Sequence, residues 1–156
     1  MDIKKVAVIG AGVMCSGIAA QITNAGLPVL LLDIVPKDAE DRSMIAKGAV
    51  AKMLKTEPAP FMHKRNAKLI TAGNLEDDIE KLADCDWIVE VVLEDLAIKH
   101  ATYEKIEKHR KPESIVTSNT STIPLAKLAE GQSDKFKQDF MITHFFNPPR
   151  YMRLLE

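Results

Sequence analysis

Short apolar runs alternate with amphipathic segments along nearly the whole chain. Six such runs, rich in Val, Ile and Leu, are typical of strands that are buried on both faces of a parallel sheet. They cover residues 6–9, 29–32, 68–71, 87–92, 114–117 and 140–143. Because segments with helical spacing separate these runs, the pattern predicts an α/β fold in which helices cover both faces of a mostly parallel sheet.

Helix start and stop signals bound the segments between these runs. A helix is predicted to begin at Val13 and to end before Gly26, a residue suited to follow a helix end. A second helix is predicted over residues 39–55, because Pro58 follows and would stop it. Asp95 is placed to cap a third helix, whose basic end suits the helix dipole. Shorter helical turns are expected near residues 75–82 and 125–128.

A glycine-containing turn joins the first predicted strand to the first predicted helix. Residues 10–15 read G-A-G-V-M-C, which fits the dinucleotide-binding pattern G-x-G-x-x-G/A except at its last position. Gly10 would permit the tight turn, and Gly12 would let the helix N-terminus approach a pyrophosphate. Asp33 ends the second strand about 20 residues later, where an acid can accept hydrogen bonds from ribose hydroxyls. A plain strand–turn–helix connection with a solvated carboxylate is the alternative, but the agreement of all these features favours a dinucleotide site.

Cys15 stands where the pattern has a Gly or Ala that lets the helix pack closely on the strand. We expect a packed thiol that does not react, because this position should face the sheet. A helix N-terminus can also lower the pKa of a thiol, so a reactive Cys15 is the alternative interpretation.

Several polar residues follow the later strands and form a candidate acid–base site. His144 follows the last strand, and a returning chain could bring Glu156 to its imidazole, which would make a general base near neutral pH. A structural histidine is the alternative. The polar cluster at residues 118–122 could donate hydrogen bonds at a ligand cleft or merely form a turn. Glu94 and Lys99 flank the start of a helix and could equally be a surface charge pair.

Composition narrows the class of protein. Lys and Arg total 21 and Asp and Glu total 22, and the formal net charge of −1 argues against a basic nucleic-acid-binding surface. The 2 Cys residues are too few for a disulfide scaffold or a Cys-rich zinc site, and no pair of histidines has convincing zinc spacing, so no metal is expected. Few cysteines also suit a reducing, cytoplasmic compartment. No apolar run reaches about 18 residues, so no membrane-spanning helix is expected.

Four stretches of the sequence resemble the NAD-binding domain of the 3-hydroxyacyl-CoA dehydrogenase family. They are residues 8–19, 89–99, 118–121 and 144–156. The last two are more specific than the glycine turn, and Cys15 departs from the family, which has Gly there. The resemblance implies a Rossmann-like, doubly wound α/β fold and NAD as the cofactor.

The same resemblance implies a reaction, the oxidation of a 3-hydroxyacyl-CoA to a 3-ketoacyl-CoA in fatty-acid β-oxidation, with a hydride passing from C3 to NAD. His144 would take the hydroxyl proton, Glu156 would orient its imidazole, and Ser121 would hydrogen-bond the substrate oxygen. The residues implied to contact NAD are Gly10, Gly12, Val13, Met14, Asp33, Glu94, Lys99, Ser121 and Asn147. Lys52 and Lys55 are candidates for contacts with CoA phosphates, although a solvated helix face is favoured.

We expect residues 1–156 to form one NAD-binding domain. Members of the family continue into a helical domain that closes the cleft and usually makes a dimer, so the chain is interpreted as part of a longer enzyme, and a homo-oligomer is expected. A nucleotide-binding module without catalysis is one alternative, and a related dehydrogenase of free β-hydroxy acids is another. Ser121, His144 and Glu156 favour a catalytic domain, because a protein that only binds a nucleotide needs none of them.

Overall fold

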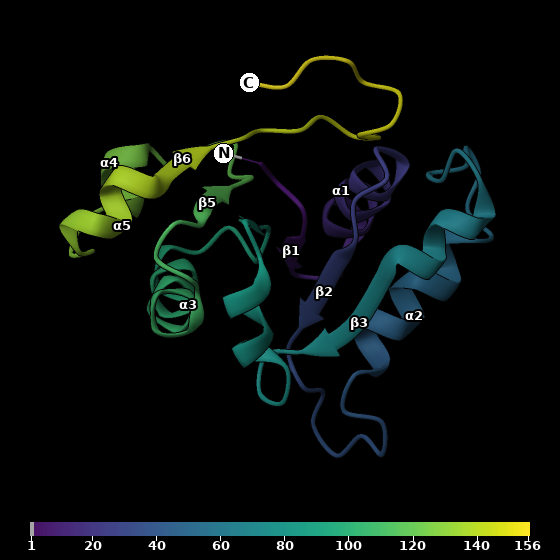
Figure 1. The fold of residues 1–156 in the computed structure, drawn as a ribbon, viewed down its shortest axis with the longest axis horizontal. Coiled ribbons are helices and arrows are strands. Elements are labelled where there is room, and N and C mark those ends of the chain that lie inside the picture. Colours follow the sequence, from purple (N-terminus) through teal and green to yellow (C-terminus); the bar gives the residue numbers. More distant parts are fainter. Residues whose placement is uncertain (1) are drawn as a thin grey trace.

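The structure, a computed structural model, describes residues 2–156 and contains a six-stranded sheet whose neighbouring strands are all parallel (Figure 1). The strands lie in the order β3-β2-β1-β4-β5-β6. Their bounds are β1 Val6–Ile9, β2 Val29–Asp33, β3 Ile70–Asn74, β4 Trp87–Glu90, β5 Ile115–Ser118 and β6 Phe140–Ile142. The chain starts at the centre with β1, moves outward to β3 and then crosses to β4, so the predicted doubly wound fold is confirmed.

Helices cover both faces of this sheet. The α-helices are α1 Val13–Asn24, α2 Met44–Met53, α3 Leu96–His109, α4 Leu125–Leu128 and α5 Asp134–Asp139, and the 3₁₀ helices are η1 Lys64–Leu69 and η2 Ile79–Asp84. Val6 and Val8 pack in one core with α1 and α2, whereas Ala7 and Ile9 pack in the other with α3, η2, α4 and α5. Figure 1 shows α1 and α2 on one side of the molecule and α3, α4 and α5 on the other. Because side chains on both faces of β1 are buried in a core, its sequence is apolar at every position.

The second helix begins later than predicted, at Met44 instead of residue 39. Asp38 has a positive φ of 57°, a conformation that helical residues do not adopt. The Asp41 side chain accepts a hydrogen bond from the backbone N–H of Ser43 at 3.0 Å. Such local side-chain contacts compete with helix formation, so residues 34–43 form a loop beyond β2.

Other elements also differ from the prediction. The strand predicted at residues 87–92 ends at Glu90, and the helical turn expected near residues 75–82 is the 3₁₀ helix η2, Ile79–Asp84. The strand predicted at residues 68–71 lies at Ile70–Asn74, because His63 Nδ1 accepts a hydrogen bond from the N–H of Arg65 at 3.1 Å and starts η1. Helix α5 is absent from the prediction, although its start carries a recognisable signal. Ser133 Oγ accepts from the N–H of Phe136 at 3.0 Å, and the buried Phe136 ring anchors the helix in the core.

Candidate functional site

The candidate residues of the sequence lie along one edge of the sheet, where the six parallel strands end. The register pairs Ile9 with Leu32 and Glu90, and Ser118 with Glu90 and Ile142, so neighbouring strands end at nearly the same level. In such folds ligands bind beyond the carboxyl ends of the strands. The segments that follow these strand ends carry Gly10, Asp33, Glu94, Asn119, Ser121 and His144.

The glycine turn after β1 has the geometry of an anion cradle. Gly10 has a φ of +112°, and a Cβ there would lie 2.8 Å from the Val91 carbonyl oxygen, so no other residue fits. Gly12 is exposed and precedes α1, and the nearest atom to a Cβ built on it is Cys15 Sγ at 3.9 Å. The turn is therefore open above the first N–H groups of α1, where a pyrophosphate would fit. Val13, 67% exposed, and the half-buried Met14 begin the helix at this opening.

Asp33 ends β2 beside the same turn. Its Oδ2 accepts a hydrogen bond from the N–H of Ala11 at 2.5 Å, and its Oδ1 accepts from the N–H of Ile34 at 2.6 Å. The carboxylate is half-buried and held in place, and each oxygen keeps acceptor capacity for a further donor. This arrangement fits the two hydroxyls of a ribose, as the sequence predicts.

Cys15 packs inside the turn, as expected. The side chain is 4% exposed, and Sγ donates a hydrogen bond to the Val91 carbonyl oxygen at 3.2 Å. Burial raises the pKa of the Cys15 thiol to about 11, with a smaller opposing effect of the backbone at Gly12. The packed position of Cys15 is therefore confirmed, and a thiolate that is scarce near neutral pH favours the interpretation as an unreactive thiol.

The returning C-terminal segment brings Glu156 to His144. His144 Nδ1 lies 3.3 Å from Glu156 Oε2. The backbones of the two residues also pair, with His144 N–H donating to the Glu156 carbonyl at 2.8 Å and Glu156 N–H donating to the His144 carbonyl at 3.2 Å. A carboxylate at Nδ1 favours the tautomer whose Nε2 carries the lone pair, as a general base requires.

The loop after β5 fixes the loop that carries His144. Asn119 Oδ1 accepts a hydrogen bond from the N–H of Phe145 at 2.8 Å. The imidazole of His144 also packs against the Phe146 ring in a tilted arrangement, with ring centroids 4.5 Å apart and an interplanar angle of 53°. Ser121 is exposed in the same loop as Asn119. The polar cluster at residues 118–122 thus lies next to the segment that carries His144.

Glu94 is the centre of a polar cluster above β4 and β5. Its Oε1 accepts hydrogen bonds from Thr120 Oγ1 and from Thr122 Oγ1, the latter at 2.9 Å, and its Oε2 lies 3.3 Å from Lys99 Nζ. Partial burial acts to raise the pKa of Glu94, but these donors outweigh it and lower the pKa to about 2. With its side chain 40% exposed, Glu94 is a persistent anion facing the ligand edge.

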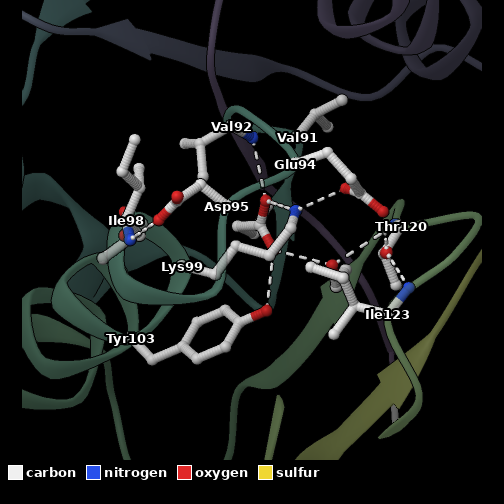
Figure 2. Close-up of polar contacts among 12 residues, drawn as sticks. Val91, Val92, Glu94, Asp95, Ile98, Lys99, Tyr103, Thr120 and Ile123 are labelled. Carbon is white, nitrogen blue, oxygen red and sulfur yellow. Dashed lines mark hydrogen bonds and ion pairs between the residues drawn. The ribbon is translucent and has the colours of Figure 1, made fainter. Parts of the chain in front are cut away.

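Lys99 is not a surface residue, so the alternative of a surface charge pair is wrong. Its side chain is 1% exposed, and Nζ binds Glu90 Oε1 at 2.8 Å on the inner side. Figure 2 shows Lys99, Glu94, Tyr103 and Thr120 converging from α3 and the loops that follow β4 and β5. Sequence reasoning did not assign Glu90 to the site, although a charged residue ending an apolar strand was the available signal.

A cavity of about 500 Å³ adjoins the glycine turn. It lies between the N-terminal half of α1, the end of α2 and the segment 147–150, and it is lined by Gly12, Lys52, Asn147 and Arg150 among others. Asn147 is exposed at its rim. Lys55 is exposed and does not line this cavity. The structure thus places Lys52, but not Lys55, where an extended ligand could pass.

Two classes of feature are missing from residues 2–156. None of their helices is long and apolar enough to cross a membrane. In the same part of the chain, no three His, Cys, Asp or Glu side chains are grouped so that they could hold a metal ion.

Comparison with known proteins agrees with this geometry. Residues 5–156 match the family described as 3-hydroxyacyl-CoA dehydrogenase, NAD binding domain. The chain is 54% identical, over its full length, to a probable 3-hydroxyacyl-CoA dehydrogenase of Deinococcus radiodurans, of which it covers 45%. Over 99% of its length it is 52% identical to a putative fatty acid oxidation complex trifunctional enzyme of Rickettsia felis, of which it covers 22%.

Solved structures show the same fold. The 3-hydroxybutyryl-CoA dehydrogenase of Escherichia coli superposes with a TM-score of 0.80 at 26% identity, over 99% of this chain and 32% of that one. The (S)-3-hydroxybutyryl-CoA dehydrogenase of Ralstonia eutropha gives 0.74 at 28% identity, over 99% and 53%. The chain therefore spans about half or less of these relatives. The glycine turn, Asp33 and the matched residues 5–156 together show that the chain belongs to the 3-hydroxyacyl-CoA dehydrogenase family, as its NAD-binding domain.

Proposed function

We propose that residues 1–156 form the catalytic, NAD-binding domain of an enzyme that oxidises 3-hydroxyacyl-CoA to 3-ketoacyl-CoA in fatty-acid β-oxidation. The observation that carries the proposal is the contact of His144 Nδ1 with Glu156 Oε2, at 3.3 Å, on the edge that also holds the glycine turn. A domain that only bound a nucleotide would have no use for an oriented imidazole there.

The residues that would hold NAD divide between the two halves of the sheet. Gly10 and Gly12, with the first turn of α1 at Val13 and Met14, would receive the pyrophosphate, and Asp33 would accept from the adenosine ribose. On the other half, the proposed contacts are Glu94 and Ser121, with Lys99 acting through Glu94 because it is buried. Asn147 is a further proposed contact, at the rim of the cavity beside Gly12. When bound, NAD supplies the acceptor for the hydride that leaves C3.

The proton of the substrate hydroxyl would pass to His144. A secondary alcohol loses a hydride readily only while its O–H proton is being removed, so base and cofactor must face one carbon. Nε2 of His144 would take this proton, and Glu156 would stabilise the resulting imidazolium through Nδ1–H. The exposed Ser121 would donate a hydrogen bond to the same substrate oxygen.

The CoA portion of the substrate would extend through the cavity beside Gly12. Its wall carries Lys52 and Arg150, which favour an anionic ligand, together with apolar side chains of α2 and the segment 147–150. The free thiols of Cys15 and Cys85 support a cytoplasmic location, because a reducing compartment keeps thiols unpaired. The exposed Leu154 and Leu155 support association with a second domain or copy.

The test joins this chain to the rest of an enzyme. The segment of the Deinococcus radiodurans relative that the chain matches is replaced by residues 1–156, and NADH oxidation with acetoacetyl-CoA is measured. We expect turnover in the hybrid and a loss of roughly 10²–10⁴-fold in His144→Ala, as is typical when a general base is removed. A folded hybrid that binds NAD without turnover would favour the non-catalytic module, and turnover retained by His144→Ala would reject the assigned base.

A further inference from the structure

A carboxylate lies inside the protein at the end of the central strand β4. Glu90 is 0% exposed. Its Oε1 accepts hydrogen bonds from Lys99 Nζ and from the N–H of Val92, both at 2.8 Å. Its Oε2 accepts from Tyr103 Oη at 2.8 Å and from Ser118 Oγ at 2.7 Å. Four donors fill the acceptor capacity of a carboxylate, so Glu90 is held as a fully bonded anion.

These donors tie together the segments that form the ligand edge. Lys99 belongs to α3, Val92 to the turn that follows β4, and Ser118 to the end of β5. The turn after β4 carries Glu94. Ser118 Oγ in turn accepts from the N–H of Thr120 at 3.3 Å, and Thr120 Oγ1 donates to Glu94. Glu90 therefore holds both loops that surround Glu94.

The charges of Glu90, Glu94 and Lys99 suggest a reason for the buried ion pair between Lys99 and Glu90. A buried ion pair contributes little stability compared with apolar residues of the same volume, so stability alone does not account for it. Glu90 neutralises Lys99 from inside at 2.8 Å, while Glu94 lies farther from Lys99, at 3.3 Å. Two carboxylates and one ammonium leave one net negative charge. This charge resides at Glu94, which is the exposed member of the three.

We propose that Glu90 is a positioning residue for the cofactor site, which binds Lys99 from the interior and so keeps Glu94 fixed as a charged acceptor for the nicotinamide half of NAD. The two halves of a dinucleotide lie over the two halves of a doubly wound sheet. Asp33 belongs to the β1–β3 half, and Glu94 follows β4 in the half that also carries His144. The inference rests on the proposed function, because it requires that this edge binds NAD.

The test is Glu90→Gln in residues 1–156, titrated by calorimetry with NAD and, separately, with AMP. The Gln amide keeps the size of the side chain, and the hydroxyls of Tyr103 and Ser118 can rotate to accept from it, so the fold should persist. Lys99 then lacks its charged partner in the interior, so its ammonium group interacts with Glu94 alone. We expect NAD to bind roughly 10- to 100-fold more weakly, the usual worth of a hydrogen bond to a charged group, and AMP affinity to stay within about twofold.

Asp139→Asn is the matched control. It neutralises a carboxylate that pairs with the buried Arg110 at 2.9 Å, in the region where α3 ends, away from the ligand edge. This variant should lower the melting temperature without changing the ratio of NAD to AMP affinity. Glu90→Asp keeps the charge but shortens the side chain, so it should lose less NAD affinity than Glu90→Gln. If the Gln variant does not fold, the NAD-to-AMP affinity ratio of Glu90→Asp is compared with that of the wild-type protein: a lower ratio supports the inference, and an unchanged ratio overturns it.

The outcomes separate the two proposals. Equal weakening of NAD and AMP, or unchanged binding of both by a folded variant, would show that Glu90 only supports the fold and would overturn the inference. If the wild-type protein binds both AMP and NAD, and substitution of Glu90 does not change the NAD affinity, the inference fails but the proposed function is retained. Wild-type protein that binds neither ligand would instead contradict the proposed function itself.

Discussion

The Asp33 carboxylate accepts a hydrogen bond from the backbone N–H of Ala11, with the oxygen and nitrogen 2.5 Å apart. The contact joins the end of β2 to the glycine turn that follows β1. It places a fixed negative charge beside the proposed pyrophosphate cradle, at the proposed site of the adenosine ribose. The next arginine along the chain, Arg42, is bound by Asp77 at 2.7 Å and by Glu76 at 2.6 Å.

The first prediction concerns the choice between NAD and NADP. Asp33 should repel the 2′-phosphate of NADP. Arg42 forms ion pairs with Glu76 and Asp77, so it is not free to bind that phosphate. NAD should therefore bind at least about tenfold more tightly than NADP, and Asp33→Asn should narrow the ratio. Calorimetry with both dinucleotides measures it. NADP affinity equal to or above that of NAD in the wild-type protein would contradict the assignment of Asp33.

The second prediction concerns Cys15. Because its thiol is 4% exposed and its pKa is raised to about 11, labelling by a thiol reagent near neutral pH should be slow, with or without NAD. Cys15→Gly should lower the free energy of unfolding by about 1–2 kcal/mol, from lost packing and from Gly in a helix, and should not weaken NAD binding. Rapid labelling that NAD blocks would instead show an exposed thiol at the cradle.

The third prediction concerns Glu156. The two backbone hydrogen bonds between His144 and Glu156 do not involve the side chains, so Glu156→Gln should keep the returning segment in place. Losing the charge-assisted contact with the imidazolium should lower kcat in the hybrid enzyme by roughly 10- to 100-fold, less than His144→Ala does. A pH profile of kcat for both variants checks this order. The reverse order would assign the base role to Glu156.

The fourth prediction follows from the pKa of Glu94, which lies at about 2 in the folded protein against an ordinary value of 4.5. A depressed carboxyl pKa stabilises the fold above the unfolded pKa, and this contribution is lost as the pH falls from about 4.5 to about 2. The difference in unfolding free energy between the wild-type protein and Glu94→Gln should therefore shrink over that range. Urea unfolding at a series of pH values measures it, and a constant difference would mean that the Glu94 pKa is not shifted.

The fifth prediction concerns residues 1–156 alone, which cover 45% of the Deinococcus radiodurans relative. The chain should bind NAD but turn over acetoacetyl-CoA far more slowly than the hybrid enzyme, because water enters an open cleft. The exposed Leu154 and Leu155 should also favour self-association at high concentration. Steady-state assays and sedimentation compare the two proteins. Comparable kcat values would show that the remaining part of the enzyme is dispensable.

Local pattern alone predicted much of the fold and singled out part of the candidate site. The strands β1 and β2 lie where their apolar runs predicted them, because strands that are buried on both faces need no polar alternation. Gly10 and Asp33 could also be recognised from the sequence, because local geometry determines the residue type at each position. A positive φ and an acid that ends the second strand are local requirements of the dinucleotide turn, so they leave a trace at fixed spacing in the sequence.

Tertiary structure decided what depends on partners from distant parts of the chain. The sequence placed Glu94 and Lys99 together but could not show that Lys99 is buried, because that depends on Glu90 in β4 and on the packing of α3 against the sheet. The pairing of His144 with Glu156 likewise needed the returning segment to lie antiparallel to the loop after β6. Side-chain spacing determines which face of an element a residue occupies, whereas burial and charge pairing are properties of the surfaces that meet there.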